Sequence, residues 1–305
     1  MKKLLLLMLV SAFLYAEPIS PIPLTIDVNK DKVTLGKKLF FDTILSADDT
    51  ISCASCHDLE NGGDDGLQFS FGIKGQEGDI NAPTVLNAVY NFRQFWNGSA
   101  KDLAHQAEGP IENPVEMGIM FQDLIQKLEK THYQKEFETI YDDGITKNNI
   151  TDAIAEFEKT LITPNAPFDR YLRGDKPAIT QKQKDGYELF KSKGCIVCHH
   201  GINVGGNLYN KFGVMEEVKS KRLGRYEVTK KESDKYYFKV PSLRNIEHTS
   251  PYLHDGRYKK LDDVVKFMAR YQLGRTVTED EIEKIVSFLK SLSGEVPLDA
   301  KRQAL

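Results

Sequence analysis

Two copies of one five-residue pattern place the strongest constraint on this chain. Cys53-Ala54-Ser55-Cys56-His57 and Cys195-Ile196-Val197-Cys198-His199 together contain all four of its cysteines. Cys-x-x-Cys-His is the attachment signature of haem c, in which both thiols bind one edge of a porphyrin and the histidine ligates the iron. One copy would also suit a redox dithiol, a zinc site or disulfides. Two copies that use every cysteine favour two covalently bound haem c groups.

The first 16 residues predict export of the protein. Lys2 and Lys3 precede an apolar run from Leu4 to Leu14, and Ala16 provides a small residue at the expected cleavage point. This is the pattern of a cleavable signal peptide, and the run is shorter than the ~20 residues that span a bilayer. We therefore expect a mature chain from residue 17 without a membrane span. The net charge of -3 gives no reason to expect nucleic-acid binding.

An internal repeat runs through the mature chain, because segments near each haem motif recur in the same order. The stretches that close the two copies, 154–161 and 285–292, have the i, i+3, i+7 apolar spacing of a helix. Further helices are expected at 103–107, 122–138, 182–191 and 261–271, whereas the alternation typical of strands is rare. The matched segments are 39–40 with 189–190, 82–87 with 240–245, and 96–98 with 254–256.

The repeat predicts an all-α fold of two cytochrome c-like haem domains with long loops. We expect an N-terminal domain at 17–166 and a C-terminal domain at 167–305, because Pro164-Asn165-Ala166-Pro167 follows the first closing helix and is typical of a boundary. A haem in each domain would supply much of the apolar core that so small a domain cannot build alone.

The two copies differ at a position that matters for iron ligation. Met268 lies seven residues after Leu261, whereas Pro110 lies seven residues after the equivalent Leu103. A haem that only transfers electrons has both axial positions filled, commonly by His and Met, and a proline cannot ligate iron. Met268 is therefore the predicted second ligand of the second haem, with Met215 as a rival. The first haem has no such ligand at the matching position.

Three further segments complete the pattern: Phe95-Trp96-Asn97-Gly98, the stretch 109–117 (GPIENPVEM) and the stretch 251–256 (PYLHDG). Together with the two haem motifs, they make the chain resemble the bacterial di-haem cytochrome c peroxidases over nearly its whole mature length. The resemblance implies a periplasmic enzyme that reduces hydrogen peroxide to water. Its electrons would come from a small periplasmic donor, either a cytochrome c or a copper protein, and the enzyme would be a homodimer.

The resemblance also implies roles for individual residues. The C-terminal haem, on His199 and Met268, would receive electrons, and peroxide would react at the N-terminal haem on His57. The other implied residues are the catalytic glutamate Glu116, the distal glutamine Gln106, the inter-haem tryptophan Trp96, and a calcium site formed by Asn81, Thr249 and Pro251.

A base is needed to move a peroxide proton when the O–O bond breaks, and a carboxylate above an open iron can do this. The residues alone leave Glu108, Glu112 and Glu116 as equal candidates. The resemblance selects Glu116.

One departure from the family concerns the loop after the first haem motif. Many members carry a histidine there that blocks the peroxidatic iron until the other haem is reduced, whereas this loop has Ile73 at that place. We therefore expect the first haem to be open in the fully oxidised enzyme. His105 and, less readily, Lys74 remain alternative ligands.

Two other functions have to be weighed against the peroxidase. A related di-haem oxidase that acts in cofactor maturation carries tyrosine instead of methionine on the second haem, so Met268 disfavours it. A di-haem electron carrier would need both irons closed, which Pro110 and the segment of Glu116 disfavour.

Overall fold

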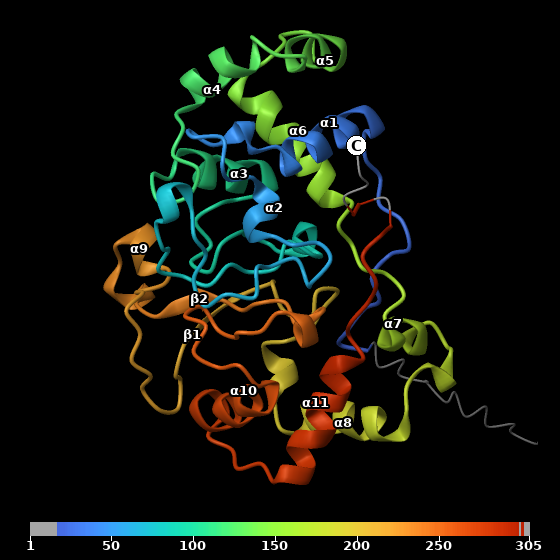
Figure 1. The fold of residues 1–305 in the computed structure, drawn as a ribbon. Coiled ribbons are helices and arrows are strands. Elements are labelled where there is room, and N and C mark those ends of the chain that lie inside the picture. Colours follow the sequence, from blue (N-terminus) through green and yellow to red (C-terminus); the bar gives the residue numbers. More distant parts are fainter. Residues whose placement is uncertain (1–16, 299, 302–305) are drawn as a thin grey trace, which may run out of the picture.

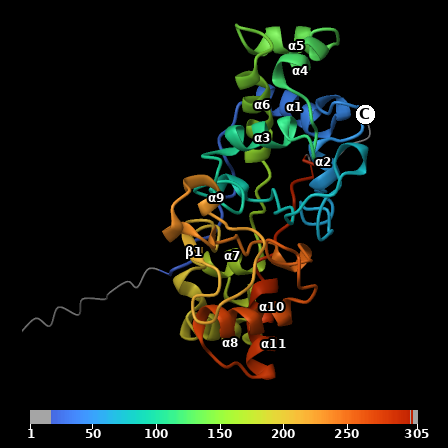
Figure 2. The ribbon, with the colours of Figure 1, turned by 90° about the vertical axis from the view of Figure 1, so that its left-hand side faces the viewer.

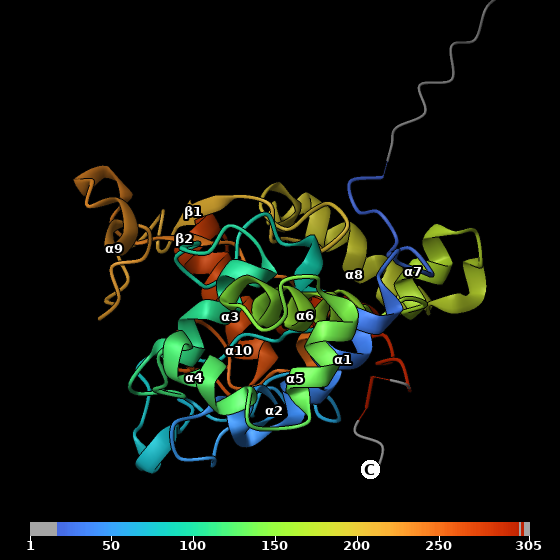
Figure 3. The ribbon, with the colours of Figure 1, turned by 90° about the horizontal axis from the view of Figure 1, so that it is seen from above.

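The computed structural model describes residues 17–298 together with residues 300 and 301. The predicted signal peptide, residues 1–16, lies outside the described residues. The two halves of the chain stack end to end, with the blue-to-green first half above the yellow-to-red second half (Figures 1 and 2). Viewed from above, the helices of the first half cover much of the second half (Figure 3). No helix in the described part of the chain is long and apolar enough to cross a membrane.

The first half is built around a pair of helices, α1 (Lys30–Phe41) and α6 (Lys147–Lys159), that cross at close range. A Cβ placed on Gly36 of α1 would lie 1.8 Å from the carbonyl oxygen of Ala153 on α6, so only glycine permits this crossing. Apolar side chains of both helices form the core there. The helices are α1 (Lys30–Phe41), α2 (Cys53–Cys56), α3 (Leu103–Glu112), α4 (Phe121–Leu128), α5 (Tyr133–Ile140) and α6 (Lys147–Lys159).

The second half repeats this construction with α8 (Gln181–Ser192) and α11 (Glu279–Lys290). A Cβ on Gly186 of α8 would lie 1.9 Å from the carbonyl oxygen of Lys284 on α11. A short antiparallel pair of strands, β1 (Tyr209–Lys211) and β2 (Tyr237–Lys239), is added to it. The helices are α7 (Pro167–Leu172), α8 (Gln181–Ser192), α9 (Tyr226–Thr229), α10 (Leu261–Phe267) and α11 (Glu279–Lys290), and the π-helical turn Met268–Gln272 continues α10.

The sequence repeat is also a repeat of backbone conformation. Asn87 and Asn245 both adopt the left-handed region, with φ of 60° and 58°, and each precedes a single 3-10 turn. Phe95 and Leu253, which precede the next matched segments, have φ of 65° and 72°. The predicted all-α fold of two cytochrome c-like halves is confirmed. The boundary after residue 166 stays a prediction, and Ile19 packs in the core of the second half.

Buried polar side chains fix the two halves to each other. Asn87 Nδ2 donates to Thr163 Oγ1 at 2.9 Å, and Thr163 Oγ1 donates to Asn245 Oδ1 at 2.7 Å. The equivalent asparagines of the two repeats are thereby joined through one threonine. Within the second half, the fully buried Arg244 and Asp169 form an ion pair at 2.7 Å. Because breaking the bonds of Thr163 to the two asparagines would leave buried polar atoms without partners, these bonds fix the relative position of the halves.

Candidate active site

The first haem motif forms the short helix α2 and ends at His57. The Nδ1–H of His57 donates to the carbonyl oxygen of Gly63 at 3.1 Å, and burial lowers the pKa of the imidazole. A neutral histidine with Nδ1 so engaged presents Nε2 to a metal, which is the arrangement of an axial ligand. The residues therefore fit a haem iron.

The second motif forms the 3-10 turn Cys195–Val197 and ends at His199. Burial lowers the pKa of His199 to about 4, so the ring is neutral and able to ligate iron. The backbone of Gly205 lies against this ring, since a Cβ there would be 3.2 Å from Nδ1.

No disulfide joins the four cysteines, and burial disfavours the thiolate form of each of them. Desolvation raises the pKa of Cys56 and of Cys195 to about 11, and it raises the pKa of Cys53 and Cys198 as well. A redox dithiol needs a lowered thiol pKa, so these environments disfavour that alternative and suit thioether attachment.

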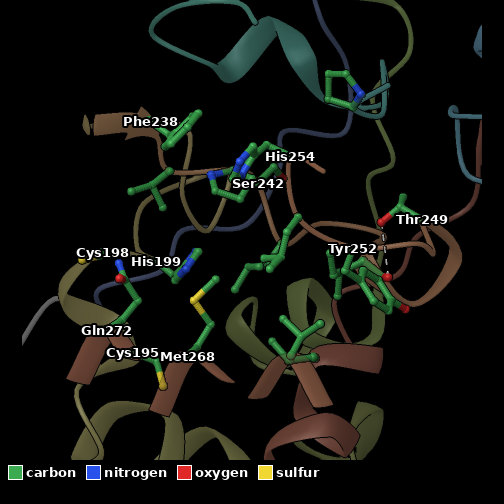
Figure 4. A pocket seen from close by; sticks show the side chains of 18 of the residues that line it. Cys195, Cys198, His199, Phe238, Ser242, Thr249, Tyr252, His254, Met268 and Gln272 are labelled. Atoms are coloured by element: carbon green, nitrogen blue, oxygen red, sulfur yellow. Dashed lines mark hydrogen bonds between the residues drawn. The ribbon is translucent and has the colours of Figure 1, made fainter. Parts of the chain in front are cut away.

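A mainly apolar cavity of about 200 Å³ lies beside the second motif. Cys195, Cys198 and His199 line one side of it, and Met268 projects into it from the π-helical turn (Figure 4). The rival ligand Met215 does not line the cavity and is 58% exposed. Met268 and His199 therefore line the same cavity, whereas Met215 does not. Such π-helical turns are frequent at functional sites.

The loop after the first motif is packed on the segment that contains Glu116. The N–H of Ile73 donates to the carbonyl oxygen of Glu116 at 2.8 Å, and Gln76 Nε2 donates to the carbonyl oxygen of Pro114 at 2.8 Å. A Cβ on Gly72 would lie 2.0 Å from the carbonyl oxygen of Val115. Ile73 itself is 5% exposed, so an alkyl side chain is buried at the loop position where the family resemblance implies a blocking histidine.

The Glu116 carboxyl differs from the other two candidate carboxyls. Asn113 Nδ2 donates to Glu116 Oε1 at 2.7 Å, and although the residue is exposed, desolvation by the surrounding protein raises its pKa. Glu108 instead forms an ion pair with Lys147 at 2.7 Å, and Glu112 Oε1 accepts from the N–H of Phe121 at 3.4 Å. Of the three, Glu116 thus has the environment that suits a proton-transferring group.

The remaining predicted residues of the first half lie on or near α3. Gln106 is partly buried, and Pro110 lies inside the same helix. His105, the alternative ligand, is exposed, and its Nδ1 accepts from the N–H of Lys101 at 3.2 Å. Lys74 is also exposed.

Trp96 lies where the two halves meet. Its Nε1–H donates to the carbonyl oxygen of Asn81 at 2.9 Å, and its ring packs edge-on to that of His254 with centroids 6.1 Å apart. Trp96 also lines the cavity of the second motif, as do the three residues predicted to bind calcium, Asn81, Thr249 and Pro251.

Known proteins match this chain over almost its whole length. A family model for di-haem cytochrome c peroxidase matches residues 30–177, and one for cytochrome c matches residues 183–293. The cytochrome c551 peroxidase of Nitrosomonas europaea is 49% identical over 286 residues, which are 92% of this chain and 85% of that protein. The chain belongs to the di-haem cytochrome c peroxidase family.

Other members of the di-haem peroxidase family agree with this. The cytochrome c551 peroxidase of Pseudomonas aeruginosa is 43% identical, over 88% of this chain and 81% of that protein. The cytochrome c peroxidase Ccp of Escherichia coli is 49% identical over 91% of this chain, which spans 61% of that longer protein. A solved MauG-like protein associated with microbial copper homeostasis shares the fold, with a TM-score of 0.79, 24% identity and coverage of 91% and 93% of the two chains. The chain is thus an oxidoreductase of the peroxidase class, and the prediction of two haem c groups is confirmed.

The sequence pattern did not predict that two charged residues of this di-haem peroxidase are buried. Lys239 and Glu158 are buried, yet a lysine or glutamate is mostly found at the surface. The sequence did mark Lys239 as a candidate functional position, because the internal repeat aligns it with Asn81, a predicted calcium ligand.

Proposed function

We propose that this peroxidase reduces hydrogen peroxide to water in its N-terminal half, with electrons that a small redox protein delivers to its C-terminal half. The observation that carries the proposal is a difference at one repeat position. Met268 projects into the cavity that His199 lines, whereas Pro110 at the equivalent position has no side-chain group that ligates iron. The C-terminal half is therefore suited to electron transfer and the N-terminal half to binding a small molecule.

In the N-terminal half, Glu116 is the proposed proton-transferring residue. When bound, haem c supplies the one-electron redox chemistry of each half. The Glu116 carboxylate would accept a proton from one oxygen of hydrogen peroxide and return it to the departing oxygen, which leaves as water. Gln106 would orient the peroxide by hydrogen bonding. With two electrons and two further protons both oxygens end as water, and such proton transfer contributes about 10²–10⁴-fold.

Trp96 is proposed to connect the halves electronically. Its hydrogen bond to Asn81 and its place in the cavity wall support this role, since they hold an aromatic ring of the first half at the wall of the second haem cavity. A calcium ion on the Asn81 side chain and the carbonyl oxygens of Thr249 and Pro251 would add the hard oxygen ligands that Ca²⁺ prefers.

The electron donor is proposed to be a small periplasmic cytochrome c or copper protein. Val197, between the two cysteines of the second motif, is 68% exposed, so the attachment edge of that haem lies near a surface that a donor can reach. The signal-peptide pattern supports the periplasm, and a homodimer is proposed from the family resemblance.

A maturation oxidase or a plain electron carrier would have different ligands. The oxidase would replace Met268 by tyrosine, and the carrier would need a second ligand where the chain has Pro110. Both features favour the peroxidase.

Optical and EPR spectra of the purified holoprotein test the proposal, taken before and after half-reduction with ascorbate and combined with assays of peroxide turnover. The peroxidase requires a high-spin haem in the state that turns over peroxide. If neither state consumes peroxide, the electron-carrier function replaces it.

A further inference from the structure

Lys239, the last residue of β2, is a buried cation at the wall of the second haem cavity. It is 6% exposed and lines the cavity together with Trp96 and His199. Among the described residues, none forms a hydrogen bond or an ion pair with its Nζ, and burial alone lowers the pKa of its ammonium to about 8. A buried ammonium without a counter-charge is unfavourable, so an anion bound in this cavity would stabilise it.

The cavity itself contains no protein anion. Among its described lining residues, Lys239 is the only lysine or arginine, and there is no aspartate or glutamate. Burial lowers the pKa of His254, the lining histidine that is not a proposed iron ligand, to about 4, so its imidazole is neutral. The group that this cavity accepts therefore has to bring the negative charge.

Haem c brings such a charge at a defined place. Its propionate carboxylates lie at the porphyrin edge remote from the thioether bonds. Cys195, Cys198 and His199 line the cavity together with Trp96 and Lys239. The N–H of Lys239 donates to the carbonyl oxygen of Trp96 at 2.8 Å, so Lys239 belongs to the part of the cavity wall where the two halves meet.

The repeat gives an independent reason to expect a cation here. Lys239 and Asn81 each stand two residues before the proline of their matched segment. The N–H of Asn81 donates to the carbonyl oxygen of His254 at 2.9 Å, and the N–H of Lys239 donates to the carbonyl oxygen of Trp96 at 2.8 Å. Trp96 and His254 are themselves repeat equivalents, so the two bonds are symmetric. At this repeat position the first half has Asn81, which is proposed to bind calcium, and the second half has the cationic side chain of Lys239.

We propose that Lys239 is a positioning residue for the C-terminal haem: its ammonium pairs with a haem propionate and holds a positive charge beside that haem and Trp96. A positive charge near a haem favours the reduced form, because oxidation adds one further positive charge to the iron. Lys239 thus keeps the reduction potential of the C-terminal haem high. This inference rests on the proposed function, which makes that haem the electron acceptor from the donor.

The test is a spectroelectrochemical titration of both haems in the full-length holoprotein with four variants. Lys239→Met removes the charge and the donor, Lys239→Gln removes the charge but keeps a donor, and Lys239→Arg keeps both. Lys211→Met removes an exposed lysine from β1, the strand paired with β2, and serves as the matched control.

The two charge-removing variants are expected to lower the ratio of reduced to oxidised C-terminal haem about tenfold at a fixed solution potential, which is about 59 mV for one electron. Lys239→Arg and Lys211→Met should leave the ratio within about twofold. A merely structural role would lower the melting temperature without changing the ratio, and an unchanged ratio in Lys239→Met or Lys239→Gln overturns the proposal. Failure of the proposed function would instead be seen as a wild-type protein with both haems that does not consume peroxide.

Discussion

Ile73 donates its backbone N–H to the carbonyl oxygen of Glu116 at 2.8 Å. This bond fastens the loop after the first haem motif to the segment of the proposed catalytic carboxyl. The packing is tight, since a Cβ on Gly118 would lie 2.5 Å from the Ile73 Cδ1 atom. The family resemblance implies a blocking histidine at this loop position, and the chain has there an alkyl side chain without a lone pair for iron.

The first prediction is that the fully oxidised enzyme is active without prior reduction. Ile73→His should install the missing ligand and make peroxide turnover dependent on half-reduction. In the oxidised enzyme turnover should fall at least about tenfold, because only the fraction of molecules with an open iron can bind peroxide. Ile73→Leu, which adds no ligand, should remain active. Turnover and the high-spin absorption of oxidised and half-reduced samples measure this. Activity of the wild type only after half-reduction would contradict it and point to His105, which His105→Ala would then test.

Glu116→Gln should lower kcat for peroxide about 10²–10⁴-fold, because the amide cannot transfer the proton. Glu108→Gln is the matched control, since Glu108 is engaged in an ion pair with Lys147, and it should retain most of the activity. The raised pKa of Glu116 also predicts the direction in which activity changes with pH. The active carboxylate accumulates as pH rises through that raised pKa, so activity should fall on the acid side at a higher pH than an ordinary glutamate gives. A pH profile of kcat that is identical in wild type and Glu116→Gln would exclude this role.

Met268→His should lower the reduction potential of the C-terminal haem, because a thioether ligand favours the reduced iron more than imidazole does. Turnover with a reduced donor protein should fall with it. Met215→Leu should change neither property, because Met215 lies outside the cavity. Redox titration of the two variants distinguishes the ligands, and a shift in Met215→Leu alone would reverse the assignment.

The sequence predicts this structure well where local pattern and repeat decide it. The haem motifs, the closing helices and the matched segments all follow from spacing. The helix expected at 122–138 is instead two helices, α4 and α5, and the break contains Thr131, whose hydroxyl accepts from the N–H of Tyr133 at 3.2 Å. Such local side-chain bonds compete with helix continuation.

Burial of charged residues was the other property that the sequence did not reveal. Lys239 lies between Phe238 and Val240, and Glu158 follows Phe157, but apolar neighbours in sequence do not show that distant segments enclose the charged side chain itself. The environment of Glu116, in contrast to Glu108 and Glu112, likewise depends on the loop of Ile73 folding onto it. The spacing of residues along the sequence does not show directly which distant segments come into contact.

Glu158, on α6, is a buried carboxyl near the first haem motif. It is 5% exposed, its Oε2 has no hydrogen-bond partner among the described residues, and burial raises its pKa to about 8. The folded protein therefore holds a proton there that an unfolded chain, with an ordinary glutamate pKa near 4.5, releases. The contribution to stability is fully present below the unfolded pKa and is lost as pH rises through the folded pKa.

Glu158→Gln should remove this loss of stability with rising pH. At pH 4.5 the variant and the wild type should differ little in the free energy of unfolding, whereas at pH 9 the variant should be more stable by on the order of a few kcal/mol, since each pKa unit corresponds to about 1.4 kcal/mol. Glu156→Gln is the matched control on the same helix, because Glu156 already has partners in Lys159 and the N–H of Asn29, and it should show no such gain with pH. Urea denaturation of the three holoproteins at both pH values measures the difference. A wild type whose stability relative to Glu158→Gln does not change with pH would mean that the Glu158 carboxyl has the same proton affinity folded and unfolded.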